Sequence, residues 1–394
     1  MSEKKQTVLL VHNYYRIPGG EDTVVANENA LLEKQGHTVY LYTRNNAEIQ
    51  DTGILSKIRL ACTSVFSLKT YKEVKRLIRD KQIDIVHVHN TLSLISPSVY
   101  YAAFSCKVPV VQTLHNFRMV CPNGLLFREG TVCEECIEKG LGCSLRHKCY
   151  RDSFLQTFVS LAILKIHRVF GTYQKINYIA LTEFNKKKIA EGNKKKNFIP
   201  LDKIYVKPNF VKPFPVENME RAENHFLYVG RLEKEKGIPF LLEAWKDLPE
   251  YILELCGTGT LEAWCRDYIA KHELHNVKLL GQQPQNVVRQ KMAQATAVVF
   301  PSQWYEGMSM VLLESMAMGT PILASNIGNG GDMIVDGING TTFVPDSIEN
   351  FLEKVKSFSG YDVEMIRKHF KELYSEEVNY QLLKQIYDTC CERK

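Results

Sequence analysis

The chain has 394 residues and a formal net charge of +6, and 45% of its residues are hydrophobic and 24% charged. This is the composition of a soluble globular protein. The chain is too long for a single hydrophobic core of ordinary size, so we expect two domains. The positive charge is too small to indicate nucleic acid as a partner. It suits anionic substrates such as nucleotide diphosphates, or an anionic membrane face.

The N-terminal residues 1–6 run directly into the apolar stretch 8–11, which is too short for a signal peptide and has no cleavage site after it. No run of about 18 apolar residues occurs, so we expect no transmembrane span. These observations predict a cytoplasmic protein. Eleven cysteines in that compartment are more often thiols or metal ligands than disulfides.

Short apolar runs alternate along the chain with helical patterns of ten or more residues. Runs of this kind are typical of parallel strands that are buried on both faces. In the first half the expected strands are 8–12, 38–42, 83–89, 108–115, 178–182 and 204–207, and in the second half 226–230, 252–256, 277–280, 297–301 and 321–324. This βαβ periodicity predicts an α/β protein with two doubly wound sheets. Prolines 208, 213 and 215 place a hinge near residues 207–218.

Two segments interrupt this pattern. Residues 116–150 form a cysteine-rich insertion without clear periodicity. Residues 151–196 are predicted as a long amphipathic helix, followed by the basic triplets Lys186–Lys188 and Lys194–Lys196. Beyond the second series of strands, residues 378–394 are expected to form a terminal helix.

Polar residues and glycines follow several of the expected strands. They are His12-Asn13, His89-Asn90, His115-Asn116, Gly257-Thr258-Gly259 and Pro301-Ser302. In open α/β sheets the ligand binds outside the carboxyl ends of the strands. Any one of these could be an ordinary start of a loop, but their accumulation favours a binding site.

The richest motif spans residues 301–321, PSQWYEGMSMVLLESMAMGTP. A strand ends here, a loop carries Glu306 and Gly307, and a helix is predicted to begin near Met308. The first amides of a helix have no acceptor within the helix and favour anionic or oxygen-rich ligands. Glu314 follows eight residues after Glu306, about 12 Å along if all eight are helical. Two carboxylates at this spacing suit the hydroxyl pairs at the two ends of a nucleotide sugar, whereas the alternative is a capped helix with a solvated carboxylate.

This motif resembles the signature of the family-4 retaining glycosyltransferases of the GT-B fold, and the resemblance extends over nearly the whole chain. It implies two Rossmann-like domains that face a central cleft. The N-terminal acceptor-side domain would span 1–207 with the insertion 116–150, the nucleotide-sugar domain would span 208–377, and 378–394 would pack back on the first domain.

The resemblance also implies roles for individual residues. Gly230, Arg231 and Lys236 lie in YVGRLEKEKG (228–237), which resembles the family's diphosphate loop, so Arg231 and Lys236 would neutralise the phosphates. Glu306 and the amides of residues 307–310 would hold the transferred sugar, and Glu314 the ribose. The remaining residues that the resemblance places at the donor are Gly257 and Gly259 in a glycine turn, Gly19 and Gly20 in the glycine loop after the first strand, Gly307, Met308, Ser309 and Met310 at the helix start, and His115 beside the reacting sugar.

The reaction implied is transfer of a sugar with retention, from a UDP- or GDP-sugar to a glycan or a lipid-linked acceptor of the cell surface. No Asp-x-Asp motif occurs, so we expect neither a metal clamp on the diphosphate nor another catalytic cofactor. A non-catalytic sugar-nucleotide or glycan-binding module on the same fold is the principal alternative, and a phosphorylase or epimerase is another. One departure concerns Gly328–Asp332, GNGGD, where the family often has a Pro and a Glu.

The insertion contains Cys121, Cys133, Cys136 and Cys149, with Cys143 between the last two. Four thiolates are enough for a tetrahedral structural zinc, and a short insertion with little apolar content gains from such a crosslink. Free thiols and disulfides are the alternatives.

The amphipathic segment and the two lysine triplets suggest peripheral contact with the anionic inner face of the cell membrane. The alternative is a core helix followed by a solvated basic loop.

Overall fold

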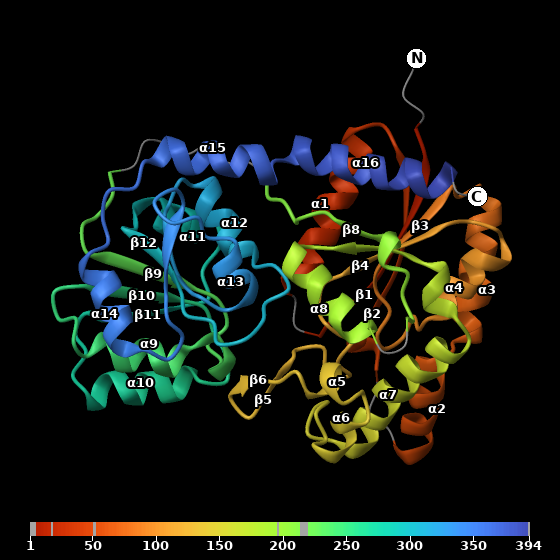
Figure 1. The fold of residues 1–394 in the computed structure, drawn as a ribbon, viewed down its shortest axis with the longest axis horizontal. Coiled ribbons are helices and arrows are strands. Elements are labelled where there is room, and N and C mark those ends of the chain that lie inside the picture. The colour runs from red at the N-terminus through yellow and green to blue at the C-terminus, as the bar shows by residue number, and fades with distance from the viewer. Residues whose placement is uncertain (1–4, 17–18, 50–52, 195–196, 213–219, 393–394) are drawn as a thin grey trace. The chain divides into compact units, whose positions relative to one another are not determined.

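The computed structural model describes residues 5–16, 19–49, 53–194, 197–212 and 220–392. These residues form two compact units, each built around one parallel sheet of six strands (Figure 1). Unit 1 comprises residues 1–125, 134–209 and 376–394, and unit 2 comprises 126–133 and 210–375.

The sheet of unit 1 has the strand order β2-β1-β3-β4-β7-β8, and every pair is parallel. The strands are β1 (Thr7–Tyr14), β2 (Thr38–Asn45), β3 (Ile85–Asn90), β4 (Val110–Leu114), β7 (Asn177–Ala180) and β8 (Ile204–Val206). All residues of β3, β4 and β7 are buried, because helices cover both faces of the sheet, and this explains their nearly continuous apolar sequence.

The sheet of unit 2 has the order β11-β10-β9-β12-β13-β14 and is also parallel throughout. Its strands are β9 (His225–Val229), β10 (Ile252–Cys256), β11 (Val277–Gly281), β12 (Ala297–Phe300), β13 (Ile322–Ser325) and β14 (Gly340–Phe343). The fully buried Trp245 packs against Phe226 and Phe351 in the core beside this sheet. Both strand orders reverse beside the first strand of their unit, β1 or β9, so the prediction of two doubly wound α/β sheets is confirmed.

Helices occupy most of the connections between strands. In unit 1 they are α1 (Gly20–Lys34), α2 (Gly53–Val65), α3 (Leu68–Asp80), α4 (Ser98–Ser105), α7 (Phe154–Val169), α8 (Glu183–Asn193) and α16 (Glu376–Glu392). In unit 2 they are α9 (Ile238–Trp245), α10 (Glu262–Lys271), α11 (Gln285–Gln294), α12 (Met310–Ala317), α13 (Gly328–Asp332), α14 (Ile348–Lys356) and α15 (Val363–Tyr374). None of the described helices combines the length and the apolar character needed to cross a bilayer.

The insertion 116–150 contains only short elements. They are β5 (Phe127–Arg128), β6 (Thr131–Val132), α5 (Glu135–Glu138) and α6 (Cys143–Arg146). The two strands pair as an antiparallel ribbon, and residues 126–133 are grouped with unit 2. Such short pieces explain why the sequence showed no periodicity here.

The prediction of one long helix over 151–196 is wrong. Helix α7 ends at Val169, and Gly171 follows with a positive φ of 62°, which a helix does not continue through. The strand β7 and the separate helix α8 come next. The triplet Lys186–Lys188 therefore lies on α8, and Lys195 and Lys196 lie outside the described residues.

The C-terminal helix α16 packs on unit 1, where Leu383, Ile386 and Tyr387 join the same core cluster as Val8 and Ile85 (Figure 1). The contacts divide the two units after Asn209, and α16 begins at Glu376, whereas the sequence pattern places these boundaries at 207 and 378. Pro213 and Pro215 of the expected hinge lie outside the described residues.

We expect Gly237→Ala to lower the free energy of unfolding by about 3 kcal/mol, because two penalties coincide. Gly237 has φ +75°, and an added Cβ would lie 1.9 Å from the carbonyl oxygen of Pro301. Gly281 provides the control, since it has φ +66° but open space at its Cβ position. Gly281→Ala should therefore cost only about 1 kcal/mol. Denaturant unfolding compares the two, and equal losses would contradict the steric argument.

Candidate functional site

The loops after β9, β10 and β12 lie against one another through their backbones. An added Cβ at Gly257 would lie 1.8 Å from the carbonyl oxygen of Gly230, and one at Gly259 would lie 2.4 Å from that of Leu232. The amide of Gly230 also donates to Cys256 O at 3.0 Å. Only glycine permits backbones to approach this closely, which explains why positions 257 and 259 are occupied by glycine. Gly230, Gly257 and Gly259 therefore lie together at the carboxyl ends of β9 and β10.

Lys236 and Glu306 form an ion pair in unit 2. Lys236 Nζ lies 2.5 Å from Glu306 Oε1, and the same oxygen accepts from Ser302 Oγ at 2.9 Å and Trp304 Nε1 at 3.0 Å. Glu306 is buried, with 8% of its surface exposed. Two residues that the sequence separates by 70 positions are thus brought into direct contact at the carboxyl end of the sheet.

Asn329 holds the loop that carries Glu306. Its side-chain amide donates to the carbonyl oxygens of Glu306 and Gly307, each at 2.6 Å. Asn329 belongs to GNGGD, the segment that departs from the family pattern. The sequence analysis did not single out Asn329, although an Asn shortly after an expected strand is a signal that could have identified it.

Helix α12 begins at Met310 after Ser309, two residues later than predicted. Glu306 therefore lies in the loop, and Gly307 and Met308 precede the helix. Glu314 lies on the helix and accepts from Gln285 Nε2 at 2.9 Å. Burial raises the pKa of Glu314, an effect that Gln285 and the charge of Arg289 oppose.

Arg231 presents its guanidinium to solvent. Its side chain is 57% exposed, and its nearest carboxylate contact is Glu235 at 3.7 Å. The backbone beneath it is fixed, because Tyr228 Oη donates to Arg231 O at 2.7 Å. An exposed cation on a fixed loop suits an anionic ligand.

In unit 1 the glycine loop is tied to the end of β1. Asp22 Oδ2 accepts from the amide of Gly19 at 3.0 Å, and Asp22 Oδ1 lies 2.7 Å from Nε2 of the buried His12. Gly19 is the residue that caps α1, and Gly20 is the first residue of that helix. Pro18 of the predicted motif lies outside the described residues.

His115 follows β4 and is half-buried. Its Nε2 lies 2.9 Å from Nδ1 of His89, and the two rings are stacked with 5.2 Å between centroids. Burial holds the pKa of His115 well below its ordinary value. His115 is therefore neutral at neutral pH.

Glu21 adjoins the glycine loop and was missed by the sequence reasoning. Burial and then the neighbouring charge of Asp22 raise the pKa of Glu21 to about 8. Its carboxylate lies 3.4 Å from Tyr15 Oη and 3.8 Å from His12 Nδ1. A carboxyl group with a raised pKa among polar groups at strand ends is typical of functional sites.

Among the described residues, no three cysteine sulfur atoms of the insertion lie within 4.8 Å of one another. Cys136 has Cys121, Cys143 and Cys149 as neighbours, and its thiol pKa is raised first by a hydrogen bond with Cys121 and then by burial. Cys133 belongs to the stretch 126–133 of unit 2. Among the described residues, the one group with three potential ligand atoms within 4.8 Å of one another is Glu28, His87 and His89.

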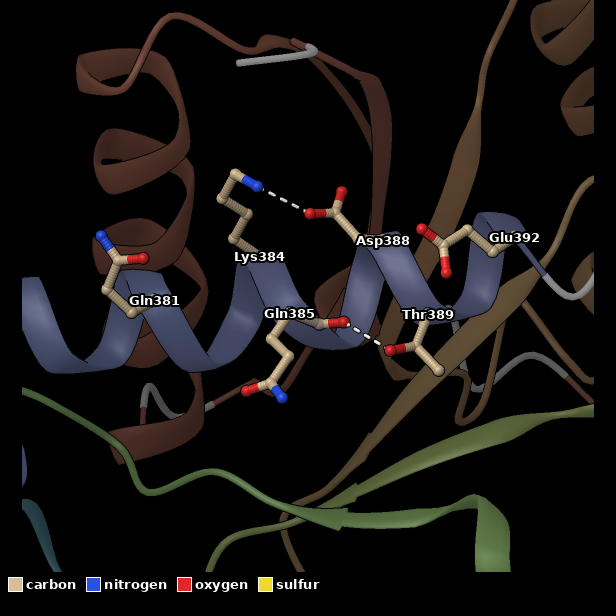
Figure 2. Close-up of a pocket in the computed structure, with 6 residues that line it drawn as sticks. All are labelled: Gln381, Lys384, Gln385, Asp388, Thr389 and Glu392. Atoms are coloured by element: carbon tan, nitrogen blue, oxygen red, sulfur yellow. Dashed lines mark hydrogen bonds and ion pairs between the residues drawn. The ribbon is translucent and has the colours of Figure 1, made fainter. Parts of the chain in front are cut away.

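A hollow along α16 lies away from the strand ends. It is lined by side chains of this helix alone, including Lys384 and Asp388, which are joined at 2.6 Å (Figure 2). Among the described residues, none from another element lines this hollow, so we assign it no part in the site.

The predicted site residues thus fall into two groups. Unit 2 brings together Gly230, Gly257 and Gly259, joins Lys236 to Glu306, and places Arg231 on the same loop system and Glu314 on α12. Unit 1 holds Gly19, Gly20 and His115 at the ends of its own strands.

Both units match models of known families. Residues 212–371 match "Glycosyl transferases group 1" and residues 18–128 match "Glycosyltransferase Family 4". The lipopolysaccharide 1,6-galactosyltransferase of Salmonella typhimurium is 32% identical over 163 residues, which is 40% of this chain and 41% of that protein. Two further relatives, an uncharacterized glycosyltransferase of Methanocaldococcus jannaschii and the glycogen synthase of Mycobacterium tuberculosis, are matched over 37% and 36% of their own length.

Solved structures show the same fold over the whole chain. The lipopolysaccharide outer core galactosyltransferase WaaB is 19% identical with a TM-score of 0.66, covering 97% of this chain and 99% of that one. Anabaena Alr3699/HepE in complex with UDP-glucose is 14% identical with a TM-score of 0.65, covering 97% and 100%. At these identities the likeness establishes the fold, which is GT-B.

Proposed function

We propose that this GT-B chain is a retaining glycosyltransferase that moves a sugar from a nucleotide-diphosphate sugar to a glycan or lipid-linked acceptor in the synthesis of cell-surface polysaccharide or glycolipid. The observation that carries the proposal is the partly buried contact between Lys236 and Glu306. Such a donor must break the bond between its sugar and its diphosphate. The cation of Lys236 suits the diphosphate on one side of that bond, and the carboxylate of Glu306 suits the hydroxyl groups of the sugar on the other. The galactosyltransferase relative supports the class of product.

A UDP-sugar is the donor that the comparisons favour, since a protein of the same fold binds UDP-glucose. We assign Arg231 and Lys236 to the diphosphate, Glu306 with the amides of residues 307–310 to the sugar, and Glu314 to the ribose. Gly19, Gly20 and His115 are assigned to the sugar and acceptor side. The positive charges of Arg231 and Lys236 stabilise the leaving nucleotide diphosphate without a metal clamp.

We further propose substitution on the front face of the sugar. The bond from the anomeric carbon to the phosphate oxygen breaks while the acceptor oxygen bonds to the same face. The acceptor proton passes to the leaving phosphate oxygen. No carboxylate is needed as a covalent nucleophile, and this leaves Glu306 as a sugar-binding group.

A face of unit 1 supports peripheral contact with an anionic membrane. Helices α2 and α7 pack against each other (Figure 1), and both expose large apolar side chains. These are Ile54, Leu55 and Ile58 on α2 and Phe154, Leu155 and Phe158 on α7, each at least 51% exposed. The exposed cations Lys57, Arg59 and Lys165 lie on the same helices, and neither helix contains Asp or Glu. Apolar area with positive charge matches an anionic lipid surface, whereas Lys188 of the predicted triplet is paired with Glu134 and Glu191.

We expect Glu306→Gln to lower the rate of sugar transfer about 100- to 1000-fold, because the neutral amide no longer supplies the negative charge that stabilises the transition state. Transfer or hydrolysis of a UDP-sugar is measured. The variant should still be stabilised by UDP, since a ligand at 100 times its Kd adds about 2.7 kcal/mol. Glu353→Gln on the exposed face of α14 is the control and should keep full rate. Full activity in Glu306→Gln would contradict the proposal, and binding of UDP without any turnover in the wild type would favour a binding module.

We expect the protein to float with anionic liposomes. Leu55→Asp with Phe154→Asp should reduce the bound fraction about tenfold or more, since each loses an apolar contact worth more than 1 kcal/mol. Met365→Asp on α15, an exposed apolar residue of unit 2, is the matched control and should float as the wild type does. Equal flotation of all three would exclude this face as the membrane contact.

Structural zinc at the cysteines stays a prediction from their spacing. Elemental analysis of the purified protein should find about one zinc per chain, and less than about 0.2 would count against the site, with allowance for partial loss to chelators. Cys136→Ser should lose the metal. Cys265→Ser, at a buried thiol of unit 2, should retain it.

A further inference from the structure

A chain of polar groups extends inward from His115 and is built from four elements of unit 1. His89 lies on β3, Glu28 on α1, and Lys207 directly after β8. Nε2 of His115 lies 2.9 Å from Nδ1 of His89, and Nε2 of His89 lies 3.3 Å from Oε2 of Glu28. Oε1 of Glu28 accepts from Lys207 Nζ at 2.7 Å, and both of these side chains are completely buried.

A metal ion is a poor occupant of this cluster, although Glu28, His87 and His89 have ligand atoms close enough together. The carboxylate of Glu28 already balances the ammonium of Lys207. A divalent cation would add two positive charges with no further anion in the cluster, and uncompensated charge in a buried position costs several kcal/mol. We therefore interpret the cluster as a hydrogen-bonded chain.

The direction of the hydrogen bonds follows from the atoms present. Nε2 of His89 and Oε2 of Glu28 are buried, and neither makes a short hydrogen bond to a described residue. The 3.3 Å contact between these two atoms is closer than the 3.6 Å contact of the same oxygen with Nδ1 of His87. Buried polar atoms are costly without a partner, and a carboxylate can only accept. His89 must therefore donate from Nε2 to Glu28. Protonating both nitrogens of His89 would add an unbalanced buried charge, so its Nδ1 accepts, and His115 donates from Nε2.

We propose that Glu28 and His89 are positioning residues that hold His115 in its Nε2–H tautomer, so that Nδ1 of His115 is an acceptor for a hydroxyl group of the bound sugar. Nδ1 has no hydrogen bond to another described residue. The assignment of the ligand rests on the proposed transferase function. The tautomer itself rests only on the contacts within unit 1.

The first test uses the wild-type protein and needs no activity. Histidine labelled with ¹⁵N reports which ring nitrogen carries the proton, and the signals of His115 are identified by their loss in His115→Gln. The expected result is a proton on Nε2 and a bare Nδ1. A proton on Nδ1 would overturn the inference, whatever reaction the chain catalyses.

The second test changes the far end of the chain. In Glu28→Gln the amide oxygen stays with the ammonium of Lys207, so the amide N–H faces His89 and donates to its Nε2. His89 then donates from Nδ1 to Nε2 of His115, which is the reverse of the direction in the wild type. His115 should then carry its proton on Nδ1. The kcat should fall about 10- to 100-fold, by analogy with loss of the hydrogen-bond partner that orients a metal-binding histidine, while the KM for the donor stays nearly constant.

Tyr387→Phe is the matched control in the same buried cluster. It removes the hydroxyl group that lies 2.8 Å from Nδ1 of His87 and leaves Glu28 and His89 in place. The tautomer of His115 and the kcat should stay as in the wild type. Loss of activity in Glu28→Gln with an unchanged tautomer would show a merely structural role and overturn the proposal. Full activity of His115→Gln would instead remove the role of His115 in the reaction and leave the tautomer result standing.

Discussion

The ion pair of Glu28 with Lys207 is the interaction on which unit 1 most depends. Both side chains are fully buried, and two charges are taken out of water only at a cost of several kcal/mol for each ion. Burial alone would raise the pKa of Glu28, but the charge of Lys207 and the contact with His89 hold it well below its ordinary value. Lys207 also donates to Asn379 of α16. Loss of either partner would leave an unpaired buried charge, which is far costlier than the buried pair. The contacts of Glu28, Lys207 and Asn379 therefore fix α1, the end of β8 and α16 together.

Unit 2 depends on a different constraint, the close approach of backbones at the carboxyl ends of β9, β10 and β12. Gly230, Gly237 and Gly257 have positive φ angles. Carbonyl oxygens occupy the space where side chains at Gly237 and Gly257 would lie, and the hydroxyl group of Tyr228 occupies that space at Gly230. The sheet order places these three strands next to one another. The loops can therefore carry Arg231, Lys236 and Glu306 on one rigid backbone, which suits the proposed binding of a diphosphate and a sugar at fixed separation.

The fold was predictable because buried parallel strands are apolar on both faces, and this pattern is visible in the sequence of most strands of both sheets. The edge strand β14, with the sequence GTTF, lacks the pattern and was not predicted. The end of α7 was not predicted, since the apolar pattern continues through Phe170 and only the backbone of Gly171 shows the break. Lys236 and Glu306 were singled out separately, but their contact joins two loops 70 residues apart, and no local pattern reports it. No local pattern reports the contacts among Glu28, Lys207 and Asn379 either, because these residues lie far apart along the chain. Asn329 and Glu21 escaped notice because their importance lies in what they touch: the carbonyl oxygens of the Glu306 loop and the carboxylate of Asp22.

The contact of Lys236 with Glu306 has a consequence for how a donor would enter. Three donors converge on Oε1 of Glu306, so the carboxylate is held in one orientation by Ser302 and Trp304 as well as by Lys236. Lys236 has a flexible stem, whereas Glu306 is fixed by its neighbours and by the bonds of Asn329 to its loop. When a diphosphate competes for the ammonium group, Lys236 can move while Glu306 keeps two of its three donors. Under the proposed function, Glu306 is thus already oriented for the sugar before the donor arrives, and only Lys236 has to change its partner.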